Sequence, residues 1–293
     1  MDQSQSRSII NLPVRRVNGL LSAPVSERLS VEEPLEIRVV FGPRENRVVK
    51  SISVTMRTPG HDRELALGFL FTEGVIRSYG EVTKVDHIDM GCSKQKQNIV
   101  QVALAEHCSP HLSQMERNFY TTSSCGVCGK GSIQSIRTSS PFKTADRPRL
   151  ELSPEVLYRL PTKLEASQDN FSQTGGIHAS GLFTLEGTLL LMREDVGRHN
   201  ALDKLIGHAM QKDLLPLERH ILLLSGRASF ELIQKAAMAG IGIVAAIGAP
   251  SSLAVDLAEE FDITLLGFLK RDRFNIYHLA KNVIIPTLYE NQN

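Results

Sequence analysis

Two cysteines in a glycine-rich segment are the residues of this sequence whose types and spacing most clearly suggest a chemical reaction. The segment reads Cys125-Gly126-Val127-Cys128-Gly129, and Lys130 follows it directly. A thiol reacts as its thiolate, which exposure and nearby positive charge favour. Glycines let a loop bend freely and approach another molecule closely. The pattern therefore indicates a reactive cysteine loop in which the second cysteine resolves an intermediate or assists the first.

Three kinds of cysteine site are compatible with this pair. A structural zinc site uses about four ligands, usually from two such pairs, whereas Cys92 and Cys108 stand alone. A thioredoxin-like redox pair follows a strand and begins a helix, but here the hydroxyl run Thr121–Ser124 precedes Cys125. The third kind is a mobile catalytic thiol loop over residues 118–131. We favour this third interpretation, and the other two stay open.

Small residues, hydroxyls and arginines recur at the ends of three predicted strands in the second half of the chain. They are Ser225-Gly226-Arg227 after the strand 221–224, Ala249–Ser252 after the strand 241–247, and Lys270–Asn275 after the strand 263–269. Ligands of open α/β sheets bind at the carboxyl ends of strands. Arginines and helix N-termini bind phosphate groups well. The repetition predicts an anionic ligand at this edge of a sheet.

Two further strings contain residues that bind anions in other proteins. Glu194–Asn200 combines a glycine, Arg198 and a helix start, and Thr174–His178 contains two glycines before His178. The first string also fits a capped turn with a surface ion pair. The second also fits a tight turn with a hydrogen-bonded histidine. Both interpretations of each string stay open.

The second half of the chain alternates strands with helices. A hairpin over residues 181–192 is followed by a helix at 200–210, and further helices are predicted at 229–239 and 251–261 between the three strands of this half. A helix also begins after Ser153. Strands alternating with helices predict an α/β domain whose sheet is largely parallel and covered on both faces.

The first half of the chain is predicted to be α+β. Strands are expected at 35–41, 48–56, 82–88 and 98–105, with a helix at 63–71. We therefore divide the chain into four parts. These are a flexible arm at 1–18, an α+β domain at 19–117, the mobile cysteine loop at 118–131 and an α/β domain at 132–293.

Composition excludes several classes of protein. The chain has 293 residues with a formal net charge of +1, so no overall basic excess indicates binding to nucleic acid. The longest apolar stretch, 241–250, is too short to span a bilayer, and residues 1–18 hold no apolar core of signal-peptide length. Four cysteines do not make a disulfide scaffold in a chain of this size. A cytoplasmic protein that binds neither nucleic acid nor membrane is expected.

The order of a hairpin followed by alternating helices and strands resembles the cytidine deaminase-like fold. Zinc deaminases use a His or Cys ligand, a catalytic Glu and a Pro-Cys-x-x-Cys pair. No cysteine follows Cys128 in this sequence. The chain therefore lacks deaminase metal chemistry, and no metal site is predicted.

Several short sequence motifs identify a protein family far more specifically than the order of the elements does. They are spread from about Val17 to Tyr277. The strings are Thr58–Gly60, Glu64–Gly74, Cys125–Gly129, Thr174–His178, Glu194–Lys204, Ser225–Arg227, Ala239-Gly240, Leu253–Val255 and Arg273–Asn275. With these strings the sequence resembles the FdhD family of formate dehydrogenase accessory proteins. Cys92 and Cys108 are not part of the pattern.

The resemblance implies a sulfurtransferase that forms a cysteine persulfide. Such a protein takes sulfur from a cysteine desulfurase and passes it to the molybdenum of bis(molybdopterin guanine dinucleotide). The sulfurated cofactor then enters the catalytic subunit of a molybdenum-containing formate dehydrogenase. The resemblance also implies a deaminase-like C-terminal domain, a smaller N-terminal domain and a homodimer.

Carried over to this sequence, Cys125 bears the persulfide, Cys128 is its partner, and 268–273 is the cofactor-binding segment. Together with the strand-end and turn residues, the predicted cofactor-binding residues are His178, Arg198, Ser225, Gly226, Arg227, Phe268, Leu269, Lys270, Arg271, Asp272 and Arg273. GDP should serve as a mimic of the cofactor's nucleotide part. The alternative from another class is a chaperone that binds the cofactor without transferring sulfur.

Overall fold

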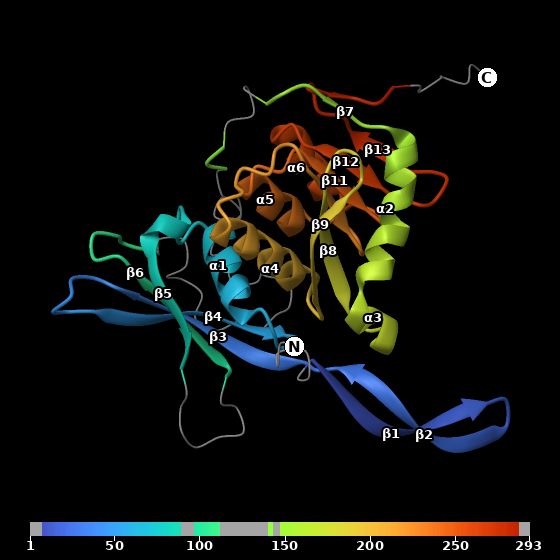
Figure 1. The fold of residues 1–293 in the computed structure, drawn as a ribbon, viewed down its shortest axis with the longest axis horizontal. Coiled ribbons are helices and arrows are strands. Elements are labelled where there is room, and N and C mark those ends of the chain that lie inside the picture. The colour runs from blue at the N-terminus through green and yellow to red at the C-terminus, as the bar shows by residue number, and fades with distance from the viewer. Residues whose placement is uncertain (1–7, 89–96, 112–139, 143–146, 287–293) are drawn as a thin grey trace.

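The structure is a computed structural model in which residues 8–88, 97–111, 140–142 and 147–286 are described. The predicted cysteine loop 118–131, with Cys125 and Cys128, lies outside the described residues. The described elements form two main sheets with helices between and beside them (Figure 1).

A six-stranded sheet is the centre of the second half of the chain. Its order is β13-β12-β11-β10-β8-β9. The strands are β8 (His178–Phe183), β9 (Leu189–Asp195), β10 (Ile221–Leu224), β11 (Ile243–Ala246), β12 (Thr264–Gly267) and β13 (Asn275–His278). Only the neighbours β10, β11 and β12 run parallel, whereas β8, β9 and β13 pair antiparallel.

The prediction of a largely parallel sheet was therefore wrong, and the sheet is mixed. The predicted hairpin forms β8 and β9, and β8 then pairs with β10 in the opposite direction. The missed strand β13 folds back on β12. A short run of apolar residues fits a buried strand of either direction, so the pattern alone leaves direction open. The likeness to the cytidine deaminase fold stays a prediction.

Helices cover both faces of this sheet, as predicted. On one face lie α4 (Arg198–Gln211), α5 (Phe230–Met238) and α6 (Ser252–Glu260), and on the other lies α2 (Pro154–Ser167), followed by α3 (Asp169–Thr174) (Figure 1). Alternate residues of β10 point to the two layers: Leu222 and Leu224 pack toward α4, and Leu223 packs toward α2.

The short strands β7 (Leu150–Glu151) and β14 (Val283–Ile284) pair beside α2. No helix in the described ranges is long and apolar enough to cross a membrane.

The first half of the chain forms a second, four-stranded sheet. Its order is β4-β3-β6-β5, built from β3 (Glu33–Phe41), β4 (Val48–Arg57), β6 (Ile99–Leu104) and β5 (Val82–His87), the last of which follows a single 3-10 turn, η2 (Tyr79–Glu81). Helix α1 (Asp62–Thr72) packs between this sheet and α4. The predicted strands and helix of this region are present, with their ends shifted by one or two residues.

The two halves share one core because α1 and α4 pack at very short range through two glycines. A Cβ on Gly68 would lie 1.9 Å from the carbonyl oxygen of Asp203, and one on Gly207 would lie 1.9 Å from that of Glu64. Only hydrogen fits at either position. A single hydrophobic cluster therefore continues from β3 through α1 and α4 to α5 and α6.

Residues 9–18 differ from the flexible arm that the sequence suggests. They form β1 (Ile9–Asn18), which pairs over its whole length with β2 (Leu21–Ser30) as an antiparallel hairpin. Figure 1 shows this hairpin extending away from the body of the molecule. Ile10, Leu12 and Val14 alternate along β1, but Pro13 lies inside the run and argues against a strand.

Candidate functional site

The strand-end residues are held together where β8 begins and β10 ends. Because these strands are antiparallel neighbours, His178 at the start of β8 lies close to the residues that follow Leu224. The backbone N–H of Ser225 donates to the carbonyl of Ala179 at 3.0 Å, and the N–H of Ala179 donates back to Oγ of Ser225 at 2.8 Å. The Ser225 side chain is thus fixed by β8.

Glycines allow the loops after β10 and β11 to come close. A Cβ on Gly226 would lie 3.3 Å from Nδ1 of His178, so a larger residue would press on the imidazole. The N–H of Gly248 donates to the carbonyl of Gly226 at 3.0 Å, and a Cβ on Gly248 would lie 3.1 Å from the backbone nitrogen of Arg227. These contacts fix the relative positions of the two loops.

The segment after β12 joins the same group of loops. The N–H of Phe268 donates to the carbonyl of Gly248 at 3.1 Å, and the N–H of Leu269 donates to that of Ala246 at 3.0 Å. Phe268 has a φ of 51°, a left-handed conformation that is strained for an aromatic residue. This backbone turns the chain away from the sheet, so that Leu269 is buried and Lys270 and Arg271 are exposed.

A cavity of about 570 Å³ lies at this edge, between the strand ends and the end of α2. Its lining residues are Pro161, Glu165, Gln168, Phe171, Gly175, Gly176, Ile177, His178, Val196, Ser225, Ile247, Leu269, Lys270 and Arg271. The lining combines apolar side chains with two cations, an imidazole, a hydroxyl and a carboxylate. Such a mixture suits a ligand with a flat apolar part and an anionic part.

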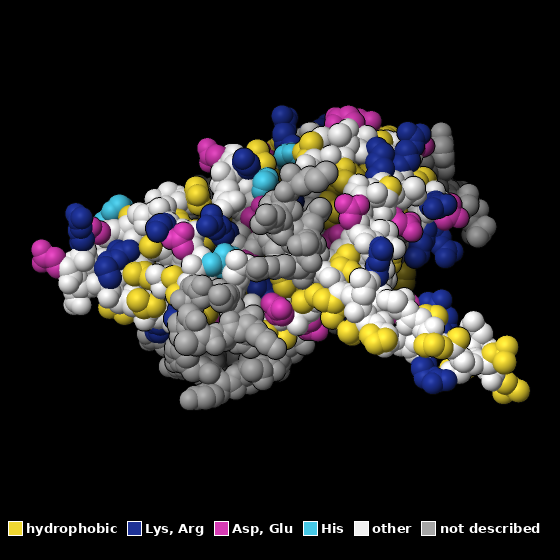
Figure 2. All heavy atoms as spheres, turned by 60° about the horizontal axis from the view of Figure 1, so that its bottom comes forward, with side chains coloured by type: hydrophobic (Ala, Val, Ile, Leu, Met, Phe, Trp, Pro, Cys, Tyr) yellow, Lys and Arg dark blue, Asp and Glu magenta, His cyan; other side chains and the backbone are white. Residues whose placement is uncertain are grey.

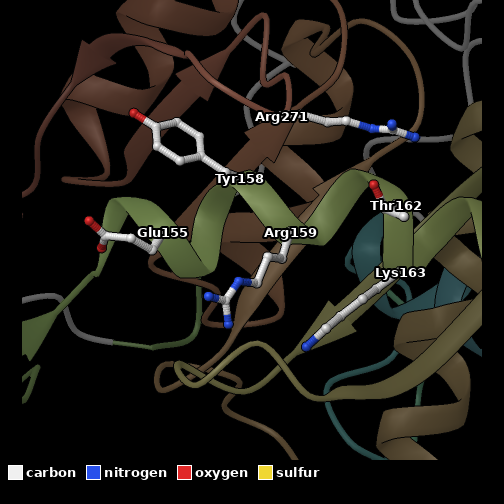
Figure 3. A pocket seen from close by; sticks show the side chains of 6 residues that line it. All are labelled: Glu155, Tyr158, Arg159, Thr162, Lys163 and Arg271. Atoms are coloured by element: carbon white, nitrogen blue, oxygen red, sulfur yellow. The ribbon is translucent and has the colours of Figure 1, made fainter.

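A second hollow of about 560 Å³ lies next to the first along α2. Glu155, Tyr158, Arg159, Thr162 and Lys163 line it, together with Arg271. Figure 3 shows the first five side chains projecting from α2 and Arg271 extending from a neighbouring segment. Arg271 is therefore shared by the two hollows.

His178 is held in its neutral form by its surroundings. Burial lowers the pKa of the His178 imidazole, and electrostatic interactions with Arg198 and His199 lower it further, while Asp195 acts in the opposite direction. A neutral imidazole has one nitrogen that donates and one that accepts a hydrogen bond. His178 can therefore contact either a donor or an acceptor on a ligand.

The wall formed by α3 is held by a residue of the Glu194–Asn200 string. The Glu194 carboxylate accepts the backbone N–H groups of Asn170 at 3.0 Å and Phe171 at 2.9 Å, at the first turn of α3. Because Phe171 and Gly175 line the cavity, Glu194 positions the wall without lining the cavity itself. Burial raises the pKa of Glu194 despite these hydrogen bonds.

Asp195 of the same string forms a buried ion pair with Lys204, which follows the string in α4. Nζ of Lys204 lies 2.6 Å from Oδ2 of Asp195, and both side chains are almost fully buried. Lys204 also donates to the carbonyl of Thr58 at 2.9 Å, and the N–H of Thr58 donates to Asp195 at 3.2 Å. Asn200 donates to the carbonyl of Met56 at 2.7 Å. These contacts tie the two halves of the chain together, and the ion pair that involves the string is buried rather than at the surface.

Of the residues predicted to bind cofactor, the structure brings five to the cavity: His178, Ser225, Leu269, Lys270 and Arg271. Gly226 does not line the cavity but lies against the His178 ring, where a Cβ would be 3.3 Å from Nδ1. Phe268, Arg227, Asp272 and Arg273 are exposed and are not among the lining residues. Arg198 is half-buried close to His178, and its Nε has no hydrogen-bond partner among the described residues.

The wall formed by Glu165, Gln168 and Phe171 was not predicted from the sequence. These residues lie at the end of α2 and in α3, and α3 has only six residues. A helix of that length leaves no periodic pattern. The preceding helix and the glycines of Thr174–His178 were visible, but nothing in the sequence places them opposite the strand ends.

Among the described residues, no group of three or more His, Cys, Asp or Glu side chains is arranged to hold a metal ion. Cys108 is a free thiol that packs partly against the core. The described part of the chain thus offers a binding cavity, while the predicted sulfur chemistry falls on cysteines outside it.

These features define a class: an α/β protein with a preformed, ligand-sized cavity at the strand ends of a mixed sheet. The family model described as the FdhD/NarQ family matches residues 31–284. The chain belongs to this family, in agreement with the resemblance of its motifs.

Several relatives have the name "Sulfur carrier protein FdhD". The protein of Streptomyces coelicolor is 47% identical over 276 residues, which cover 92% of this chain and 95% of the relative. That of Mycolicibacterium paratuberculosis is 48% identical over 92% of this chain and 97% of the relative. The protein of Picrophilus torridus is 42% identical over 89% of this chain and 93% of the relative.

A crystal structure from Desulfotalea psychrophila, provisionally described as a formate dehydrogenase accessory protein, has the same overall fold. It superposes with a TM-score of 0.68 at 20% identity and covers 94% of this chain and 99% of its own. At this level of identity the similarity speaks for the fold alone.

Proposed function

We propose that this protein is a sulfur carrier for formate dehydrogenase. It accepts sulfur from a cysteine desulfurase as a persulfide on Cys125. It then passes this sulfur to the molybdenum of bis(molybdopterin guanine dinucleotide), its substrate, before the cofactor is inserted into the catalytic subunit of a formate dehydrogenase. The cytoplasm is where these partners meet. Membership of a family whose relatives are named sulfur carriers supports the first part, and the cavity supports the second.

The loading step is an exchange between two cysteines. The Cys125 thiolate attacks the outer sulfur of the persulfide on the desulfurase. A new S–S bond forms on Cys125, the S–S bond on the desulfurase breaks, and the desulfurase cysteine leaves as a thiolate. Thiolate character decides the rate of such exchanges, and Lys130, two residues after Cys128, provides positive charge near the loop in sequence.

The delivery step needs two electrons, because persulfide sulfur must become sulfide to bind molybdenum. Cys128 supplies them if its thiolate attacks the inner sulfur of the Cys125 persulfide. A Cys125–Cys128 disulfide then forms, and the outer sulfur leaves as hydrosulfide. An external thiol reduces the disulfide and restores both cysteines. The Cys-x-x-Cys spacing permits this bond within one loop.

The observation that carries the cofactor part of the proposal is the lining of the cavity. Lys270 and Arg271 suit the phosphates of a guanine nucleotide, and Arg271 offers a planar pair of donors. Phe171, Ile177 and Leu269 offer apolar surface for a ring system. The backbone hydrogen bonds between the strand ends hold this arrangement before any ligand binds, which lowers the entropy lost on binding.

Sulfur loading tests the proposal directly. Purified protein is incubated with a cysteine desulfurase and ³⁵S-cysteine, and the peptide that contains Cys125 is analysed by mass spectrometry. Wild type should gain one sulfur on Cys125, Cys125→Ala should gain none, and Cys128→Ala should load but release sulfide slowly. Cys108→Ala is the matched control, since Cys108 packs against the core and lies outside the motif.

A cofactor-binding chaperone without sulfur transfer is the competing function. If Cys125→Ala binds GDP and activates formate dehydrogenase as well as wild type, the chaperone is correct and sulfur transfer is not. If Cys125→Ala binds GDP normally but yields an inactive dehydrogenase that sulfide restores, the carrier function stands.

A further inference from the structure

One acidic side chain lines a cavity whose other charged groups suit an anion. Among the described residues that line it, Glu165 is the single carboxylate, and Lys270 and Arg271 are the two cations. A carboxylate placed beside the phosphates of a ligand would oppose their binding. Glu165 must therefore lie away from the phosphates and face another part of the ligand.

The Glu165 carboxylate is not occupied by the protein itself. Within the described ranges, neither Lys270 nor Arg271 forms an ion pair with it, and no side chain donates a hydrogen bond to it. The residue is exposed and lines the cavity. An ionised carboxylate accepts hydrogen bonds at both oxygens, so both are available to a ligand.

Glu165 belongs to a wall built from one face of α2. Pro161 and Glu165 lie in α2, and Gln168 is its C-cap. Their spacing of i, i+4 and i+7 places them on the same side of the helix, and all three line the cavity. Phe171 of α3 extends this wall with an aromatic ring. The two cations come from a different element, the segment after β12, so the acid and the cations belong to separate walls.

Gln168 is fixed in the same wall. It is only 5% exposed, yet it lines the cavity. Its side chain donates a hydrogen bond that favours the charged form of Glu194. The Glu194 carboxylate also accepts the backbone N–H groups of Asn170 and Phe171. One carboxylate thus holds both the Gln168 amide and the first turn of α3. Since an amide has two N–H groups and a carbonyl, contact with Glu194 leaves Gln168 able to bond a ligand as well.

The wider surface does not decide what the cavity binds. Figure 2 shows Lys and Arg side chains interspersed with Asp and Glu over the described part of the face that it displays. The formal net charge of the chain is also only +1. Selection among anionic ligands therefore depends on the groups inside the cavity rather than on a long-range field.

We propose that Glu165 selects guanine among the nucleotide bases and that the Gln168 amide assists it. The inference rests on the proposed function, in which this cavity binds a guanine nucleotide. The Glu165 carboxylate accepts the ring N1–H and the 2-amino group of guanine, which are neighbouring donors, and the Gln168 amide donates to the O6 carbonyl. Phe171 offers its ring to the base, while Lys270 and Arg271 bind the phosphates.

This arrangement distinguishes guanine from other bases by its pattern of donors. Hypoxanthine lacks the 2-amino group, so one carboxylate oxygen loses its partner. Adenine and cytosine present a ring nitrogen that accepts, in place of the N1–H donor, and this lone pair repels a carboxylate. A site built to hydrogen-bond a ligand rejects an analogue that lacks the matching group. The cost of a negative charge in an anion-binding cavity is offset by this selectivity.

Calorimetric titration of the full-length protein with GDP, inosine diphosphate and ADP tests the proposal. Wild type should bind GDP roughly 10- to 150-fold more tightly than inosine diphosphate, the range for one charge-assisted hydrogen bond, and ADP more weakly still. Glu165→Gln keeps the shape of the side chain but turns a donor toward the 2-amino group. It should weaken GDP binding and reduce the ratio of the GDP and inosine diphosphate affinities by about tenfold or more.

Glu259→Gln is the matched control. It removes one exposed carboxylate from α6, on the other face of the sheet, and should leave the ratio unchanged. Circular dichroism checks that each variant is folded.

The outcomes separate this inference from the function on which it rests. A wild type that binds GDP and inosine diphosphate equally well overturns the role of Glu165 and leaves the proposed function standing. A Glu165→Gln variant that binds both ligands more tightly by the same factor also overturns it, because Glu165 would then only repel the phosphates. A selectivity that Glu165→Gln leaves unchanged places the base against another wall. A wild type that does not bind GDP at all overturns the cofactor part of the proposed function and this inference with it.

Discussion

The segments 194–204 and 268–273 both mix acids with bases but are used in opposite ways. The first runs from the end of β9 into α4, and the second follows β12. In the first, Asp195 and Lys204 are buried and pair with each other. In the second, Lys270 and Arg271 are exposed and line the cavity. The comparison shows that charged residues at the end of a strand either stabilise the core or stay available to a ligand, depending on whether the chain continues into the core or leaves it.

Replacement of Lys204 by Met should have the largest effect on stability. The substitution leaves Asp195 buried without its cation, which typically costs about 3–5 kcal/mol of the free energy of unfolding. Urea unfolding followed by circular dichroism measures the loss. Lys212→Met is the control, since Lys212 is exposed just after α4 and should change stability by less than about 0.5 kcal/mol.

A double variant sharpens this test. Asp195→Asn together with Lys204→Met removes both charges, so it should recover part of the loss seen with Lys204→Met alone. A loss of under about 1 kcal/mol for Lys204→Met would contradict the structural role assigned to segment 194–204.

Arg271→Ala should affect binding and leave stability nearly unchanged. Loss of a charge-assisted hydrogen bond to phosphate costs about 1.5–3 kcal/mol, so GDP affinity should fall roughly 10- to 150-fold. Because Arg271 is exposed, the free energy of unfolding should change by less than about 0.5 kcal/mol. Calorimetric titration with GDP measures the affinity. Arg227→Ala, which removes a strand-end arginine that does not line the cavity, should cost less; a larger loss for Arg227→Ala would move the ligand away from Arg271.

Acid should lower the free energy of unfolding modestly through three half-buried histidines. Burial lowers the pKa of His87, His178 and His220 below the ordinary value of 6.5. Below about pH 6.5 the unfolded chain therefore binds more protons than the folded chain. The free energy of unfolding is fully retained above pH 6.5, and it declines as the pH falls from 6.5 toward the lowered pKa values of the folded protein.

The midpoint of thermal unfolding between pH 7.5 and 5.5 measures this slope. His178→Gln should reduce it, because His178 is one of the three groups that resist protonation. His107→Gln, at an exposed position, should leave it unchanged. A slope that His178→Gln leaves as steep as in wild type would contradict the lowered pKa of His178.

Local signals predicted most of the elements because each acts within a few residues. Ser153 begins α2 by accepting the N–H of Val156, and Ser251 begins α6 by accepting that of Ala254. The strands of both sheets other than β13 followed from their apolar runs. The hairpin β1–β2 was missed because Pro13 and Pro24 lie inside its alternating runs, and proline within a run argues against a strand. The helix α3 was missed because it is too short for a pattern.

The cavity was predictable in part for a similar reason. Strand ends of parallel neighbours share an edge, so Ser225 and Arg271 were expected close together, and both line the cavity. Glu165 and Phe171 were not expected, since they come from the other face of the sheet. Their approach depends on how α2 and α3 pack and on the Glu194 carboxylate that fixes α3.

The sequence by itself determined the family and the main elements and predicted the reactive pair Cys125 and Cys128, because those depend on residue types at short spacing. Only the tertiary structure decided the directions of the strands, the burial of Lys204 and the pairing of β1 with β2. These depend on which surfaces meet across long stretches of chain. A side chain's type is written in the sequence, but whether it meets solvent, a counter-charge or a partner is set by packing, which no local pattern encodes.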